Sequence, residues 1–139
     1  MRLLITGSDG YIGTRLAPYL MQHGHEVTGL DTGYYRDGIL YHDPGRMPVR
    51  PYTRVLDLRR AEPGELRGID AVVHLGELSN DPLGENRPEI TYQINHEGSV
   101  HLAALAREAG VRRFIYTSSC SVYGLGSGEF LAVRSPVHP

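Results

Sequence analysis

Short apolar runs alternate with longer segments of helical periodicity along the chain. Five runs have the length of a buried strand, at residues 2–6, 26–31, 54–58, 70–75 and 113–118. Apolar residues recur at helical spacing over 11–24, and Gly24 is a natural stop for this first helix. The segment 89–109 is a second predicted helix, with one apolar stripe formed by Ile90, Ile94, Gly98, Leu102, Leu105 and Ala109. Pro18 lies inside that helix, where proline costs about 3 kcal/mol or causes a kink, but the periodicity still predicts a helix.

The segments between these elements are expected to be irregular. The pattern predicts loops at 32–50 and 80–88, a helical turn at most over 63–68, and a tail without periodicity over 124–139. Strands that alternate with helices imply parallel βαβ units. We therefore expect the α/β fold class, as a Rossmann-type doubly wound parallel sheet of about five strands. Ligands of such sheets bind at the carboxyl ends of the strands, near the switch in strand order.

Composition narrows the possible functions. The 139 residues suffice for one domain with a core, and the net charge of −2 does not favour nucleic acid or an anionic membrane as partner. No apolar run reaches the roughly 20 residues of a membrane span, and the first residues lead directly into a strand, so we expect a cytoplasmic protein. All 14 basic residues are arginines, and lysine is absent.

Cysteine and histidine residues do not indicate a reactive or metal-binding cluster. Cys120 is the lone cysteine, which excludes an internal disulfide, and we expect it to be a small packed residue instead of a nucleophile. The seven histidines are scattered along the sequence, so no metal site is predicted. His74 lies in an apolar strand and is expected to pack in the core.

The strongest motif is the glycine turn "TGSDGYIG" at 6–13, between the first strand and the first helix. Gly7 permits a tight turn, Gly10 allows the backbone to approach a pyrophosphate, and Gly13 allows close packing of helix and strand. Tyr11 and Ile12 open the helix, whose N-terminus offers N–H groups to phosphates. The spacing is GxxGxxG, and an ordinary tight turn between a strand and a helix is the structural alternative.

An acidic residue at the end of the second strand strengthens the cofactor interpretation. Asp31 follows Gly13 by 18 residues, close to the separation expected for the acid that binds the adenosine ribose of a dinucleotide. A carboxylate there would repel a 2′-phosphate, and no arginine occupies 32–35, so NAD is favoured over NADP. The alternative for Asp31 is a solvated strand end.

Together these segments resemble the extended short-chain dehydrogenase/reductase family, which contains nucleotide-sugar epimerases and dehydratases. The resemblance rests on "TGSDGYIG", "VLDL" at 55–58, "VVHLGELSNDP" at 72–82 and "YQINHEGSVHLAALAREAGVRRFIYTSSCSVYG" at 92–124, with an "SP..P" segment at 135–139. It covers nearly the whole chain in the family's order. It implies that 1–139 is a truncated NAD-binding domain, incomplete at its C-terminal side and without the substrate domain.

The resemblance implies further cofactor-binding residues. Asp57 and Leu58 match the pair that lies against the adenine, although Asp57 could instead cap the strand end. Leu75, Gly76 and Glu77 match the segment that passes the ribose and phosphates of the cofactor, usually "HLAA" in the family.

Glu77 replaces a small apolar residue of that pattern, so it either turns outward or faces the substrate. Asn95 matches a structural or water-binding asparagine of the long helix, with a local capping amide as the alternative. Thr117 is expected to line the edge of the cofactor.

The resemblance also implies one catalytic residue. Ser119 lies four residues before Tyr123 and matches the family serine whose hydroxyl binds the reacting oxygen of the substrate; a polar turn is the alternative. Ser118 and Ser121 have weaker claims. The family also requires a Tyr-x-x-x-Lys pair shortly after the "SP..P" segment, and a chain without lysine cannot contain it.

Two hypotheses follow for function. The first is the cofactor-binding half of an NAD-dependent nucleotide-sugar epimerase or dehydratase, in which the complete enzyme takes the nucleotide sugar and these residues alone are inactive. The second is a non-catalytic dinucleotide-binding or interaction module. The resemblance also implies an uncovered apolar face on the fifth strand and the helix 89–109, so a second copy or a companion chain is an expected partner.

Overall fold

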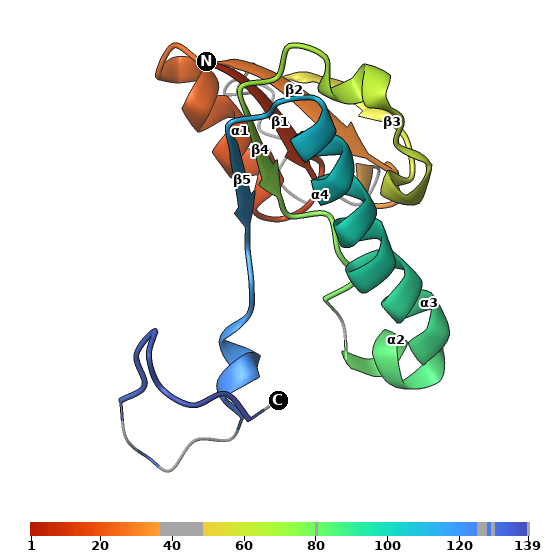
Figure 1. The fold of residues 1–139 in the computed structure, drawn as a ribbon, viewed down its shortest axis with the longest axis vertical. Helices are drawn as coiled ribbons and strands as arrows, with labels where there is room; N and C mark the ends of the chain where they lie inside the picture. Colours follow the sequence, from red (N-terminus) through yellow and green to blue (C-terminus); the bar gives the residue numbers. More distant parts are fainter. Residues whose placement is uncertain (37–48, 80, 125–127, 129, 139) are drawn as a thin grey trace.

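A five-stranded parallel sheet forms the centre of the molecule (Figure 1). The computed structural model describes residues 1–36, 49–79, 81–124, 128 and 130–138. The strand order is β3-β2-β1-β4-β5. The strands are β1 (Arg2–Thr6), β2 (Glu26–Asp31), β3 (Tyr52–Val55), β4 (Ala71–His74) and β5 (Arg113–Tyr116). The predicted Rossmann-type α/β fold class is confirmed.

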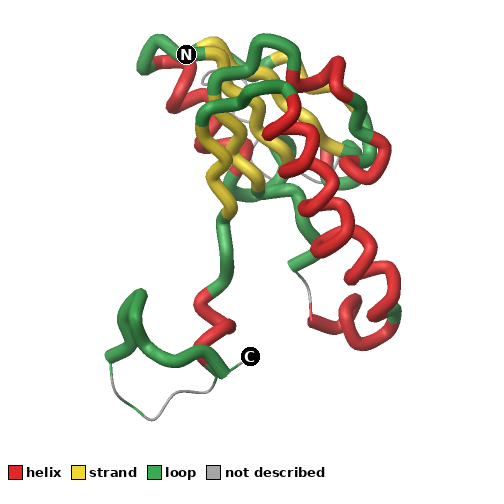
Figure 2. The backbone as a smooth tube through the Cα atoms, in the orientation of Figure 1, coloured by secondary structure: helices red, strands yellow, loops and turns green. Residues whose placement is uncertain are grey.

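One helix lies between β1 and β2 and a longer helical stretch lies between β4 and β5, whereas only 3₁₀ turns are described between β3 and β4 (Figure 2). The helices are α1 (Gly13–Gln22), α2 (Asp81–Asn86), α3 (Pro88–Tyr92) and α4 (Ser99–Glu108), with a π-helical segment at Gln93–Gly98 between α3 and α4. Short 3₁₀ turns occupy Leu58–Arg60, Pro63–Leu66 and Cys120–Tyr123. Pro18 lies within α1 and is buried, so the predicted helix does form around it.

The strand register aligns the carboxyl ends of the strands at one edge of the sheet. Thr6, the last residue of β1, lies opposite Leu30 of β2 and His74 of β4, and His74 lies opposite Tyr116 of β5. The chain moves from β1 outward to β2 and β3, and then returns to the other side of β1 with β4. The switch in strand order therefore lies between β1 and β4, where doubly wound sheets bind ligands.

Each face of the sheet carries one part of the core. On one face, Ile5 and Val73 of the sheet pack with Ala17 of α1. On the other face, Leu4 packs with Leu102 of α4, and both side chains are almost fully buried. Because both faces are covered, the central strands are continuously apolar, as parallel strands usually are.

One predicted strand boundary and one predicted loop are wrong, each for a local reason. The third strand covers Tyr52–Val55 and not 54–58, because the Asp57 carboxylate accepts a hydrogen bond from the Arg59 N–H and starts a 3₁₀ turn. The segment 80–88, expected as a loop, contains α2 and the start of α3. Pro88 opens α3, a position where proline's missing N–H costs nothing.

The long helix predicted over 89–109 is present as one helical run from α3 through the π-helical segment to α4. Leu102 and Leu105 of the predicted apolar stripe are buried, together with Ala106. Ala109 is exposed and lies beyond the helix. No helix among the described residues is long and apolar enough to cross a membrane.

After β5 the chain leaves the sheet and lies apart from α2 and α3 (Figure 1). Its end folds back on itself, since the N–H of His138 donates to the carbonyl of Val122 at 2.8 Å. Cys120 is exposed, so its prediction as a packed residue is wrong. Parts of the predicted loop 32–50 (37–48) and of the tail 124–139 (125–127, 129 and 139) lie outside the described residues, as does Asn80.

Candidate functional site

The glycine turn connects β1 with α1 at the carboxyl edge of the sheet. Gly7 has a φ of +70°, and its N–H donates to the carbonyl of Leu30 at 2.8 Å. A Cβ atom on Gly13 would lie 2.2 Å from the carbonyl oxygen of Gly7 and 2.6 Å from the Cα of Ser8. The turn and the first residues of the helix are therefore in backbone contact, which is possible only without side chains at these positions.

The two residues that precede α1 are exposed next to this turn, whereas Gly13, the first residue of α1, is buried. The side chains of Tyr11 and Ile12 are 94% and 57% exposed. Among the hydrogen bonds between described residues, none uses the N–H of Tyr11, Ile12 or Gly13 as donor. The helix dipole adds partial positive charge at this point. Free N–H groups beside a glycine turn are suited to an anionic ligand such as a pyrophosphate, and a dinucleotide fits this donor set.

Asp31 joins the turn through its carboxylate. One oxygen accepts a hydrogen bond from the N–H of Asp9 at 3.0 Å, and the other accepts from the N–H of Gly33 at 2.7 Å. The side chain is partly buried and points at the glycine turn. The structure thus brings the predicted ribose-binding carboxylate and the predicted phosphate-binding turn together.

Two charged residues of this region form a pair that was not predicted. Asp9, inside the glycine turn, has a side chain that is 8% exposed, and it forms an ion pair with Arg36 at 2.9 Å. The Nε of Arg36 donates to the same carboxylate oxygen at 3.0 Å. The sequence does place an acid among three glycines, but it does not indicate that an arginine 27 residues later is its partner.

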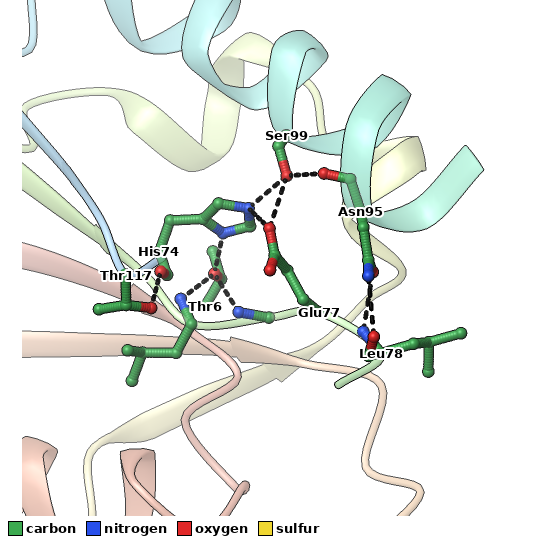
Figure 3. Close-up of polar contacts among 9 residues, drawn as sticks. Thr6, His74, Glu77, Leu78, Asn95, Ser99 and Thr117 are labelled. Atoms are coloured by element: carbon green, nitrogen blue, oxygen red, sulfur yellow. Dashed lines mark hydrogen bonds and ion pairs between the residues drawn. The ribbon is translucent and has the colours of Figure 1, made fainter. Parts of the chain in front are cut away.

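A polar cluster links β1, β4 and α4 (Figure 3). His74 is fully buried, which confirms its prediction as a core histidine. Its ring nitrogens lie 2.6 Å from the Thr6 hydroxyl and 2.7 Å from the Ser99 hydroxyl. The Thr6 oxygen also accepts hydrogen bonds from the N–H groups of Leu75 and Gly76, at 3.2 and 3.1 Å. Thr6 therefore fixes the loop that follows β4 against the glycine turn.

The hydrogen bonds of this cluster have one consistent direction. The Ser99 hydroxyl donates to the Asn95 carbonyl at 2.6 Å, so it can accept from the Nε2–H of His74. The Nδ1 of His74 then accepts from the Thr6 hydroxyl. If Nδ1 also carried a proton, the Thr6 oxygen would face three N–H donors, from His74, Leu75 and Gly76. The proton of the Thr6 hydroxyl would then have no acceptor. The surroundings therefore hold His74 as the neutral imidazole.

Glu77 does not turn outward, one of the two orientations considered for it. Its carboxylate points toward α4, 3.4 Å from the Ser99 hydroxyl and 4.0 Å from the Nε2 of His74 (Figure 3). Hydrogen bonding to Glu77, followed by burial, raises the pKa of Tyr116 to about 12. The Tyr116 phenol is therefore a proton donor at neutral pH and not a base. An open hollow of about 400 Å³ lies beside Tyr116 and is lined by Asn95 and residues of α2 and α3.

Asn95 and Thr117 hold backbone segments at the same edge. The Asn95 side chain accepts from the N–H of Leu78 and donates to its carbonyl, both at 2.8 Å (Figure 3). The Thr117 hydroxyl donates to the carbonyl of His74 at 2.8 Å. The first pair of bonds supports the structural role considered for Asn95, and contacts of either residue with a cofactor stay predictions.

Stability is expected to depend on pH through His74. Burial lowers the pKa of His74 below its ordinary value of 6.5, while the charge of Glu77 opposes this change. Below pH 6.5 the unfolded chain binds a proton that the folded chain does not, so the free energy of unfolding should fall by up to about 1.4 kcal/mol per pH unit. Urea denaturation at pH 5–8 would measure this fall in the free energy of unfolding. In His74→Gln the fall between pH 6.5 and pH 5 should be smaller. If the variant showed the same dependence on pH as the unaltered chain, His74 would not be its cause.

Three other predicted site residues make no hydrogen bond to the glycine turn among the described residues. The Asp57 carboxylate is held by Arg59, with N–O distances of 3.0 and 2.6 Å, and these hydrogen bonds hold the pKa of Asp57 below its usual range. The Leu58 side chain is buried in the core against α4. Ser119 is exposed, and its hydroxyl contacts Ser121. The adenine contacts of Asp57 and Leu58 and the catalytic role of Ser119 stay predictions.

The chain is similar to one known family and to several known proteins. The sequence model described as "NAD dependent epimerase/dehydratase family" matches residues 3–139. A UDP-glucose 4-epimerase of Klebsiella pneumoniae is 33% identical over 131 residues, which are 89% of this chain and 93% of that protein. A 3-beta-hydroxysteroid dehydrogenase of Mycolicibacterium neoaurum is 32% identical over 130 residues, 87% of this chain but 32% of that protein.

Solved structures agree with this result. The structure of a UDP-glucose 4-epimerase from Stenotrophomonas maltophila, with bound NAD and formylated UDP-arabinopyranose, superposes with a TM-score of 0.89 at 28% identity. The match covers 99% of this chain and 43% of that chain. The chain thus spans about a third of the length of the Mycolicibacterium protein and less than half of the length of the Stenotrophomonas protein.

Proposed function

The chain belongs to the NAD dependent epimerase/dehydratase family, and on this basis we propose that residues 1–139 form the NAD-binding domain of a nucleotide-sugar epimerase or dehydratase. The observation that carries the proposal is the glycine turn. Gly13 contacts Gly7 through the backbone, the N–H groups of Tyr11 and Ile12 donate to no described residue, and the Asp31 carboxylate binds the same turn. These groups suit the pyrophosphate and the ribose of NAD.

The relatives support a cofactor role for the part of the protein that they share with this chain. One relative is named for a nucleotide sugar and another for a steroid, and both match nearly the same extent of this chain. The region that these two differently named enzymes share with this chain is therefore more consistent with cofactor binding than with substrate selection. The epimerase and dehydratase assignment rests on the family and on the resemblance of the sequence.

Each group has a role in this proposal. The N–H groups at the start of α1 bind the pyrophosphate, and Asp31 accepts hydrogen bonds from the adenosine ribose. Leu75 and Gly76, fixed by Thr6, line the cofactor next to the turn. Bound NAD supplies the hydride acceptor. Ser119 provides a hydroxyl for the reacting oxygen of the sugar.

Calorimetric titration of the chain with NAD tests the proposal. We expect weak binding with one site per chain, and we expect ADP to compete, because the described contacts suit the pyrophosphate and the ribose. NADP should bind less well, since a carboxylate at Asp31 repels a 2′-phosphate. Absence of heat with NAD, at concentrations that would detect millimolar binding, would refute the proposal.

The same preparation should not interconvert UDP-sugars. Lysine is absent from the 139 residues, so the Tyr-x-x-x-Lys pair of the family is not among them. We therefore propose that these residues bind the cofactor without completing the reaction by themselves. Turnover of UDP-glucose by the chain alone would contradict this part of the proposal. It would not contradict the proposed NAD site.

A further inference from the structure

We propose that Asp9 determines cofactor choice, because it holds the Arg36 guanidinium in an ion pair and so withholds it from a 2′-phosphate. The inference rests on the proposed NAD site and adds a specificity determinant to it. The glycines and Asp31 account for binding a dinucleotide, whereas Asp9 and Arg36 have no role in that account.

The ion pair between Asp9 and Arg36 is close, and its Asp9 side chain is nearly buried. Arg36 donates to one oxygen of Asp9 from Nε at 3.0 Å and from Nη2 at 2.9 Å. The side chain of Asp9 is 8% exposed, and that of Arg36 is 43% exposed. The N–H of Asp9 donates to the Asp31 carboxylate at 3.0 Å. Asp9 therefore contacts both the guanidinium and the predicted ribose-binding acid.

The charges at this point oppose a phosphate. The carboxylates of Asp9 and Asp31 both lie beside the proposed ribose, and the Arg36 guanidinium is already paired with one of them. An arginine near the ribose is the group that accommodates the 2′-phosphate of NADP in dinucleotide sites. Arg36 could turn to such a phosphate only by leaving a nearly buried carboxylate unpaired, which is energetically unfavourable. The ion pair therefore favours a dinucleotide without the 2′-phosphate.

The alternative is that the ion pair between Asp9 and Arg36 only stabilises the turn and does not affect cofactor choice. Arg36 also closes a turn, since its N–H donates to the carbonyl of Gly33 at 3.1 Å. If the ion pair served only to brace this turn, its loss would weaken NAD and NADP binding equally. A change in the ratio of the two affinities therefore separates specificity from bracing.

Asp9→Asn tests the inference, because asparagine keeps the size and one acceptor oxygen while it removes the charge. We expect the NADP to NAD affinity ratio, measured by calorimetry, to rise about tenfold. Glu65→Gln is the matched control, because Glu65 is an equally buried partner of Arg54 in a separate ion pair. It should leave the ratio unchanged. An unchanged ratio in Asp9→Asn, with NAD still bound, would overturn the inference.

Arg36→Gln provides a second test that does not depend on the first variant. Its removal leaves the Asp9 carboxylate unpaired beside the proposed ribose, so the ratio of NADP to NAD affinity should stay the same or fall, and a rise in this ratio would overturn the inference. In Asp9→Asn/Arg36→Gln the gain in NADP affinity should disappear. Absence of NAD binding by the unaltered chain would instead refute the proposed function itself, so the two failures are distinguishable.

Discussion

Gly13→Ala is expected to lower the free energy of unfolding by about 3 kcal/mol and the melting temperature by about 10 °C. The added Cβ would lie 2.2 Å from the Gly7 carbonyl oxygen and 2.8 Å from the Ser8 carbonyl carbon. These are backbone atoms, so α1 must move away from the turn to accept the methyl group. The N–H groups of α1 would then shift, and NAD affinity should fall by more than about tenfold.

Gly64→Ala is the control for this substitution. Gly64 lies in the 3₁₀ turn Pro63–Leu66, and a Cβ there would meet no atom within 4 Å. It should therefore leave stability and NAD binding close to those of the unaltered chain. Thermal denaturation followed by circular dichroism, with calorimetric titration of NAD, measures both effects. A Gly13→Ala chain of unaltered stability would show that the close packing of turn and helix is not required.

Asp31→Ala should reduce NAD affinity about 10- to 100-fold and abolish the preference for NAD over NADP. The carboxylate is proposed to accept hydrogen bonds from the ribose, and its negative charge disfavours a 2′-phosphate. The substitution also removes the acceptor for the N–H groups of Asp9 and Gly33, so part of the loss will come from a disordered turn. The ratio of NADP to NAD affinity is therefore the decisive quantity, and calorimetry measures it.

Asp70→Ala is the matched control for Asp31→Ala. Asp70 also accepts a hydrogen bond from a backbone N–H, that of Arg2 at 2.7 Å, but it lies at the opposite edge of the sheet. Its loss should reduce stability without altering the preference for NAD. If Asp31→Ala kept both its NAD affinity and its preference, Asp31 would be a strand-end residue without a role in binding.

The main elements of the fold could be predicted because their causes are local. The apolar runs predicted four of the strands to within two residues at either end, and the spacing of Leu102 and Leu105 predicted the buried side of the long helix. The failures also have local causes. The segment 80–88 was predicted as a loop, although proline is tolerated in the first turn of a helix and Pro88 opens α3. A side-chain hydrogen bond at Asp57 ends the third strand early.

The candidate site could be predicted only in part. The glycines and Asp31 carry a recognisable spacing, so their meeting at one turn was foreseeable. The roles of Asp9, Arg36 and Ser99 carry no such spacing. Glu77 could be identified as unusual in the sequence, but its orientation toward His74 and Ser99 depends on how α4 packs over β4.

The sequence by itself determined the order of strands and helices, the α/β class and the glycine turn, because periodicity and backbone freedom act over a few neighbouring residues. The tertiary structure decided which polar groups meet. Thr6 and His74 are 68 residues apart and become partners because β1 and β4 lie side by side in parallel register. A hydrogen bond depends on distances of about 3 Å, which the packing of distant elements sets. The determinants of cofactor choice proposed for Asp9 and Arg36 belong to this second class.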